Sequence, residues 1–435
     1  MFPFFRHRLD LHMMEVLSGA AVALFLRLLG GISQLLFNII LARSVGAQGM
    51  GVYALAVSTS TLTSLIGRIG LDQTMLRFIA VHADACAWGK VKGVFARGMA
   101  IALFASTVTA VVLFLASPWL SVTIFHQPSL EMPMRWMALS VVPFSLLNLI
   151  AASLRSLMLT HYSFLIQVVL VPTIGCIVLL PLAYLGFGIN GAVASYILST
   201  VIVFIVALFL WRKSVTQGRQ AIVEMMPAKE ILEVSFPMAW VAVMTWVMSM
   251  ADTVILGMYR PSSDVGIYTA ALRIAMLSSF ILVAVNSITA PKFAALYESG
   301  DIIGLGKLAK HSTRFMMLSA GPVLLLFIAT PGFVMGIYGR EFTAGAIPLT
   351  IISIGQLFNV ATGSVGQILT MAGKQIVLRN IMIFSAILSI FLSLALIPKF
   401  GILGAALSNG ISVVVVNLAA AYAVNRHLKI SVCLY

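Results

Sequence analysis

Phe187–Val203 reads FGINGAVASYILSTVIV, and Phe400–Val416 reads FGILGAALSNGISVVVV. Nine of these seventeen positions are identical at an offset of 213 residues. Both stretches are uncharged and almost wholly apolar, which is typical of helices that cross a membrane. The two stretches therefore indicate that one membrane-spanning unit occurs twice in the chain.

Two further pairs of segments repeat in the same order. Asn148–Ser153 begins with Asn and ends with Ser, as Asn359–Ser364 does, at an offset of 211. Gly51-Val-Tyr53 matches Gly266-Ile-Tyr268 at an offset of 215. Apolar helices resemble one another by chance, but three ordered matches at similar offsets favour a true internal repeat.

The composition is that of an integral membrane protein. The 435 residues are 61% apolar and 9% charged, and the mean hydropathy is +1.07. A soluble protein cannot hide this much apolar surface, because its outside must meet water. We predict an all-α integral membrane fold with twelve transmembrane helices, near 16–42, 49–71, 93–116, 134–158, 163–185, 188–211, 235–258, 264–291, 314–335, 346–371, 376–397 and 402–424.

The repeat divides these helices into two lobes. We predict an N-terminal six-helix lobe at 1–211, a polar cytoplasmic linker at 212–234 and a C-terminal six-helix lobe at 235–435. An even number of spans gives both lobes the same orientation, so they form a parallel pseudo-repeat. Such repeats place a substrate cavity between the lobes and expose it alternately to each side of the membrane. This organisation predicts a transporter.

The basic residues indicate the orientation in the membrane. With a cytoplasmic N-terminus, the inner segments hold nineteen of the 27 Lys and Arg, and the outer segments hold only five: Arg43, Arg135, Arg260, Arg340 and Lys399. The positive-inside rule therefore predicts that both termini are cytoplasmic. The net charge of +14 is spread over every inner loop, which suits an anionic leaflet. We expect no nucleic-acid partner, because no single basic stripe with interleaved aromatics occurs.

Four charged residues qualify as charges in the bilayer core, where a charge is costly and usually functional, paired or both. Arg27 lies near the middle of the first span, and Arg68 lies near the inner end of the second, one turn before Asp72. Asp252 and Arg273 lie about 10 Å and 13 Å from the outer ends of the seventh and eighth spans, at 1.5 Å per residue.

Each of these charges has a structural and a functional interpretation. Asp252 either forms an ion pair with Arg273 or carries a coupling ion, H⁺ or Na⁺. Arg68 is close enough to the interface to snorkel, and would otherwise be a first contact for an anionic substrate. Arg27 either binds helix carbonyls or faces the substrate cavity.

Patterns for catalysis or metal binding are missing from the sequence. The seven His are mostly in loops and do not recur at ligand spacing, and the three Cys are far apart. We therefore expect no catalytic residue, no metal site and no cofactor.

The motifs in the first two spans of each half resemble a known family. They are Arg27-Leu-Leu-Gly30, Asn38-Ile-Ile-Leu-Ala-Arg43, Gly49-Met-Gly-Val-Tyr53, Gly70-Leu71, Arg77-Phe-Ile-Ala80, Asp252-Thr-Val-Ile-Leu-Gly257 and Gly266-Ile-Tyr-Thr-Ala-Ala-Leu-Arg273, with Pro291 closing the eighth span. The chain resembles the polysaccharide transporters, or O-antigen and repeat-unit flippases, of the multidrug/oligosaccharidyl-lipid/polysaccharide flippase superfamily. The resemblance runs through nearly the whole chain and defines the superfamily better than the substrate.

This resemblance implies a V-shaped, two-lobe flippase in the bacterial inner membrane. It would move an undecaprenyl-pyrophosphate-linked oligosaccharide from the cytoplasmic to the periplasmic leaflet, with membrane lipids and polysaccharide assembly proteins as further partners. By the same resemblance, Arg27, Arg273, Arg68 and Asn38 are the expected substrate-binding residues. Lipid II flippases have a second Arg and an Asp where this chain has Ser33 and Gln34, and two more spans than expected here.

Three other classes of protein are alternatives to a polysaccharide flippase. A drug–cation antiporter of the same superfamily usually keeps acidic residues in the core of its first lobe, where this chain offers only Asp72 near an interface. A membrane-embedded glycosyltransferase or polymerase needs carboxylates or a metal site, yet the outer loops offer only the widely separated Glu131, Asp264 and Glu341. We therefore expect a transporter and not an enzyme. The usual basic-and-glycine motif of major-facilitator exporters is missing from 82–92.

Overall fold

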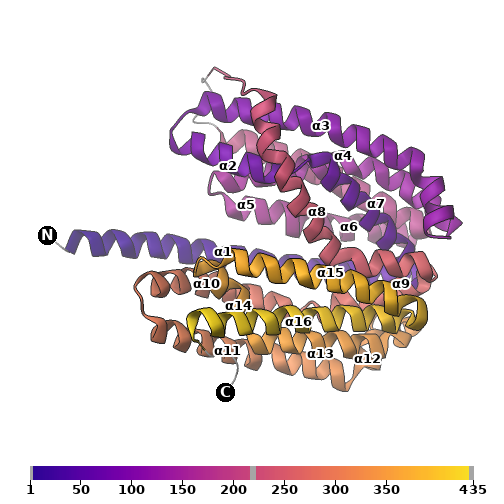
Figure 1. Cartoon of the computed structure of the whole chain (residues 1–435). Coiled ribbons are helices and arrows are strands. Elements are labelled where there is room, and N and C mark those ends of the chain that lie inside the picture. The colour runs from indigo at the N-terminus through magenta and orange to yellow at the C-terminus, as the bar shows by residue number, and fades with distance from the viewer. Residues whose placement is uncertain (1–2, 216–221, 431–435) are drawn as a thin grey trace. The chain divides into compact units, whose positions relative to one another are not determined.

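A computed structural model describes residues 3–215 and 222–430, and in this part of the chain every regular element is a helix (Figure 1). The α-helices are α1 (Pro3–Arg68), α2 (Leu71–Asp84), α3 (Trp88–Trp119), α4 (Glu131–Ser156), α5 (Thr160–Phe164), α6 (Val171–Tyr184), α7 (Gly188–Ser214), α8 (Ala228–Tyr259), α9 (Ser262–Ala275), α10 (Ser278–Glu298), α11 (Ile302–Ala329), α12 (Pro331–Gly336), α13 (Ala346–Thr362), α14 (Val365–Met371), α15 (Gln375–Phe400) and α16 (Ile402–Leu428). π-Helical turns extend α3 and join α5 to α6. The predicted all-α membrane fold is confirmed.

Eleven helices in the described residues are long and apolar enough to cross a membrane, one fewer than the twelve predicted spans. The difference arises in α1, whose apolar part, Phe25–Arg68, contains most of the first two predicted spans. Its 44 residues would extend about 66 Å, roughly twice the thickness of a bilayer core. Gly46 interrupts this helix with φ 68° and ψ −173°, a conformation that glycine adopts without a Cβ penalty. The count of twelve stays a prediction.

Large apolar side chains project from the helices into their surroundings. Phe104 on α3, Leu318 on α11 and Phe391 on α15 are 75%, 77% and 66% exposed. Contact with water would make such surfaces unfavourable, whereas lipid chains solvate them well. The exposed residues therefore match a multi-pass membrane protein.

The chain forms two compact units. The N-unit consists of Leu29–Met250 with Pro261–Gly266, and the C-unit consists of Met1–Leu28, Ala251–Arg260 and Ile267–Tyr435. These units are defined by contacts between residues, whereas the predicted lobes are defined by the repeat in the sequence. The lobe boundaries therefore stay a prediction.

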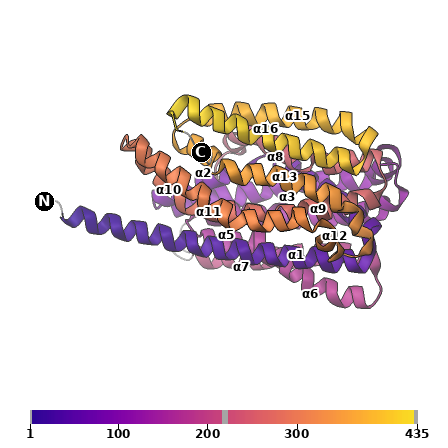
Figure 2. The same ribbon diagram turned by 90° about the horizontal axis from the view of Figure 1, so that it is seen from below.

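Each unit has its own apolar core. In the N-unit, α4 packs against α2, α3 and α7, and its buried residues include Leu147, Leu149 and Ile150. In the C-unit, α16 packs against α13 and α15, which run side by side with it in Figure 2. A second apolar cluster around Phe293 and Leu369 joins α10 to α14.

The predicted linker is partly described. Residues 216–221 lie outside the described part of the chain. The segment before α8 lies against α3, because the Glu224 amide donates a hydrogen bond of 3.1 Å to the Gly89 carbonyl. A Cβ on Gly93 would lie 1.8 Å from the Glu224 carbonyl oxygen, so only glycine allows this approach.

Candidate functional site

Asp252, on α8 in the C-unit, is a carboxylate within a membrane-spanning bundle, and its residue is only 6% exposed. Hydroxyl and amide groups from three other helices donate hydrogen bonds to it. The partners are Ser393 Oγ on α15 at 2.5 Å, Asn409 Nδ2 on α16 at 3.1 Å, Ser408 Oγ on α16 at 3.3 Å and Tyr268 OH on α9 at 3.4 Å. We call these five residues the Asp252 site.

The hydrogen-bond donors around Asp252 are all neutral. A predicted alternative was an ion pair between Asp252 and Arg273, but Arg273 is not among the described partners of this carboxylate. Helix α9 carries Tyr268 to the carboxylate and Arg273 five residues further along the helix, on another side.

The matching positions of the first half of the repeat carry aromatic residues in place of this polar site. At an offset of 215, Asp252 and Tyr268 correspond to Phe37 and Tyr53 of the N-unit, and at an offset of 213 Asn409 corresponds to Tyr196. In the N-unit these positions form an aromatic cluster, with ring centroids 5.7 Å apart for Phe37–Tyr53 and 6.4 Å apart for Tyr53–Tyr196. Aromatic packing is stabilising by itself. The buried carboxylate thus stands at a position where the other half of the repeat has a packed aromatic ring. We interpret this difference as favouring a functional role for the carboxylate.

The Asp252 site is rich in oxygen atoms that could bind a hard cation. The carboxylate and the hydroxyls of Ser393 and Ser408 converge, and Asn409 Oδ1 is buried without a hydrogen-bond partner. Hard cations prefer carboxylate, hydroxyl and amide oxygens. The same carboxylate could instead take up a proton, since the surrounding hydroxyls can donate or accept.

The predicted substrate-binding residues divide between the two units. Arg27, half-buried on α1, belongs to the C-unit together with Asp252 and the half-buried Arg273. Asn38 and Arg68 belong to the N-unit. The assignment of Arg27 differs from the sequence-based expectation, which placed it in the first lobe with the rest of the first span.

The side chains of Arg68 and Asn38 have partners in their own unit. Arg68 is 8% exposed and forms an ion pair of 2.7 Å with Asp72. Asn38 is 6% exposed and donates a 2.6 Å hydrogen bond to the Gln34 carbonyl. Both residues therefore have structural partners beside any role in binding.

Sequence reasoning singled out Asp252 but missed the residues that surround it: Tyr268, Ser393, Ser408 and Asn409. Ser and Asn are common in membrane helices, and each looks unremarkable alone. The available signal was the repeat, because aligning the halves shows polar residues at 252 and 409 where the first half has aromatic rings.

The apolar helices define a multi-pass membrane protein. The chain belongs to the polysaccharide biosynthesis protein family, whose sequence profile matches residues 40–347. This confirms the family predicted from the motifs.

Named relatives are similar to the chain at low identity. The probable flippase AglR of Haloferax volcanii is 24% identical over 184 residues, 42% of this chain and 39% of that protein. The capsular polysaccharide biosynthesis protein CapF of Staphylococcus aureus is 24% identical over 185 residues, 42% of this chain and 47% of that protein. The matched region thus spans less than half the length of these relatives. Stage V sporulation protein B of Bacillus subtilis is 22% identical, covering 95% of this chain and 83% of that protein.

Solved structures share the fold. An inward-facing multidrug resistance MATE family transporter of the MOP superfamily matches with a TM-score of 0.74 at 15% identity, covering 94% of this chain and 98% of that one. The lipid II flippase MurJ, in an inward closed conformation, matches with a TM-score of 0.73 at 13% identity, covering 94% and 87%.

Proposed function

We propose that the protein flips an undecaprenyl-pyrophosphate-linked oligosaccharide from the cytoplasmic to the periplasmic leaflet of a bacterial inner membrane. The family match and the relatives named as flippases support this function. Surface polysaccharide, such as O-antigen or exopolysaccharide, would be the product of the assembly proteins that act after it.

The Asp252 site is the observation that best supports a transport mechanism. Four neutral donors surround a buried carboxylate at a place where the other half of the repeat has packed aromatic rings. Binding of H⁺ or Na⁺ neutralises that charge and changes the relative free energies of two conformations, which is how an ion gradient drives alternating access. In this proposal Asp252 is the coupling residue.

Arg27 and Arg273 are the proposed contacts of the pyrophosphate. A diphosphate that crosses the hydrocarbon needs compensating charge along its path. Arg is suited to this task because its planar guanidinium binds phosphate oxygens through two parallel hydrogen bonds. Membership of both residues in one compact unit supports a shared role. Arg68 and Asn38 would then be accessory contacts.

Complementation of a strain that lacks the gene tests this function. Wild-type protein should restore surface polysaccharide, whereas Arg27→Ala and Asp252→Asn should fail at normal membrane levels. Arg27→Lys should restore it only partly, because Lys keeps the charge and loses the bidentate geometry.

Drug resistance provides the counter-test. A drug–cation antiporter would leave polysaccharide unchanged in the deletion strain and would lose drug resistance instead. That result would contradict the proposed substrate while leaving a role for Asp252 open.

A further inference from the structure

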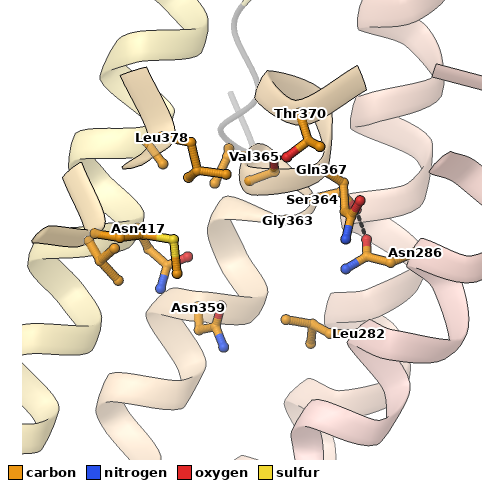
Figure 3. Close-up of a pocket in the computed structure, with 14 residues that line it drawn as sticks. Leu282, Asn286, Asn359, Gly363, Ser364, Val365, Gln367, Thr370, Leu378 and Asn417 are labelled. Atoms are coloured by element: carbon orange, nitrogen blue, oxygen red, sulfur yellow. Dashed lines mark hydrogen bonds between the residues drawn. The ribbon is translucent and has the colours of Figure 1, made fainter. Parts of the chain in front are cut away.

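A cavity of about 290 Å³ lies within the C-unit (Figure 3). Its described lining residues include neither Asp252 nor Arg27, Arg68 or Arg273. Polar side chains from α10, α13, α14 and α16 line it, together with apolar residues of α10, α15 and α16. We call it the amide pocket, after its polar lining of Asn286, Asn359, Ser364, Gln367, Thr370 and Asn417. Its volume is near the lower end of the range of about 300–1,000 Å³ found for small-ligand sites.

A break between α13 and α14 forms one wall of the pocket. Gly363 has φ +71°, and a Cβ there would lie 2.0 Å from Thr313 Oγ1, so this turn requires glycine. The next residue, Ser364, donates a 2.5 Å hydrogen bond to Asn286 Oδ1, which joins the break to α10. This bond is drawn in Figure 3, where the Asn286 amide nitrogen is directed toward the pocket. The pocket is therefore held by specific contacts.

The other half of the repeat lacks these features. At an offset of 211, Gly363 corresponds to Ala152 and Ser364 to Ser153, which lie inside the unbroken helix α4. Asn359 corresponds to Asn148, whose Oδ1 accepts a 2.9 Å hydrogen bond from Gln167. The same offset brings Gln167 onto Leu378, an apolar residue that lines the amide pocket.

Asn148 of the N-unit thus bonds to Gln167, outside its own helix, whereas Asn359 of the C-unit donates a 3.1 Å hydrogen bond to Gln356 within α13 and lines the cavity. The matching residues of the first half form an unbroken helix, so the glycine break belongs to the second half.

The lining determines which ligands fit. The fourteen described lining residues include no acidic, basic or histidine side chain, so a charged group would lack compensation there. Amide and hydroxyl side chains both donate and accept hydrogen bonds, which matches the hydroxyls of a sugar. Leu282, Leu378 and Met382 offer apolar surface to the C–H face of a sugar ring.

We propose that the amide pocket is a carbohydrate subsite, which binds one uncharged sugar unit of the transported glycan while the arginines hold the pyrophosphate. This inference rests on the proposed flippase function. It gives the protein a means to select the glycan by its hydroxyl pattern, separately from the shared lipid pyrophosphate.

A substitution that fills the pocket tests the inference. A Cβ on Gly366, in α14, would meet only Leu378 Cδ1 at 4.0 Å, so Gly366→Leu should fold and occupy the cavity. Gly366→Ala is the small control, and Gln375→Ala removes an exposed amide just outside the pocket. Asn286→Ala is a second test variant if Gly366→Leu does not reach the membrane.

The binding probe is N-acetylglucosamine, with saturation-transfer difference NMR on the purified full chain in a detergent without a sugar headgroup. We expect a full signal from wild type and Gln375→Ala, an intermediate signal from Gly366→Ala because its added methyl enters the pocket, and a loss of at least about ten-fold with Gly366→Leu or Asn286→Ala. Surface polysaccharide should fall in parallel. Absence of a wild-type signal, an equal signal from glycerol, or an unchanged signal in both test variants would overturn the subsite.

A further outcome separates this inference from the proposed function. If Arg27→Ala abolishes surface polysaccharide but Gly366→Leu does not, the flippase function stands and the carbohydrate subsite is wrong. If the deletion strain keeps its polysaccharide, the flippase function fails, whatever the sugar-binding signal shows.

Discussion

Ser393 makes the shortest described contact with Asp252, and the same helix supplies a control for it. Its hydroxyl donates a 2.5 Å hydrogen bond to the carboxylate, whereas the buried Ser385 Oγ, also on α15, has no hydrogen-bond partner. We expect Ser393→Ala to lower polysaccharide export several-fold and to destabilise the protein by about 1.5–3 kcal/mol, as for other hydrogen bonds to charged groups. Ser385→Ala should leave both unchanged.

Export measured by polysaccharide extraction, and unfolding of the purified protein followed by heating, would check this pair. Equal effects of the two substitutions would mean that loss of any buried hydroxyl on α15 is harmful. The special position of Asp252 would then have no support from this experiment.

Helices α1 and α9 cross with their backbones in contact at the two repeated Gly-x-Tyr motifs. A Cβ on Gly51 would lie 1.7 Å from the Ser262 carbonyl oxygen, and one on Gly266 would lie 2.0 Å from the Ala47 carbonyl oxygen. We expect Gly266→Ala to separate the two segments and to cost about 1–3 kcal/mol, as overpacking does. Its thermal midpoint in detergent should fall by several degrees.

Gly332→Ala, on α12, is the matched control for Gly266→Ala, because nothing lies within 4 Å of an added Cβ. Alanine is the better helix former, so this change should be neutral or slightly stabilising. A Gly266→Ala protein as stable as the control would show that the crossing has room to adjust.

The orientation of the whole chain in the membrane follows from the charge asymmetry and can be tested by labelling. Ser129, Thr343 and Ser299 are exposed, and the first two lie in predicted outer loops while the third lies in a predicted inner loop. In a background without the three native cysteines, Ser129→Cys and Thr343→Cys should react with an impermeant thiol reagent added outside cells. Ser299→Cys should react only after permeabilisation. The reverse pattern would overturn the predicted topology.

Ser262, also in a predicted outer loop, is unsuitable for this labelling. It is only 5% exposed and hydrogen-bonds to Gln127. Its accessibility would report local packing as well as the side of the membrane.

The sequence alone determined the membrane class, indicated the internal repeat and singled out Asp252 as a charge within a span. These features follow from local composition, because hydrocarbon excludes charge so strongly that apolar runs and rare charges are visible without coordinates. The close spacing of Arg68 and Asp72 on successive helices likewise made their proximity apparent.

Tertiary structure decided which groups surround each of these residues. The donors of Asp252 on α15 and α16 lie 141, 156 and 157 residues along the chain from it. The order of the helices along the chain does not determine how each helix is rotated about its own axis. The sequence therefore provided no means of predicting the hydroxyl and amide donors that the structure places at this carboxylate. The amide pocket depends in the same way on a helix break at Gly363 and on five helices that line it. Helix packing selects which face of each helix turns inward, and apolar spans carry too little periodicity to predict that choice.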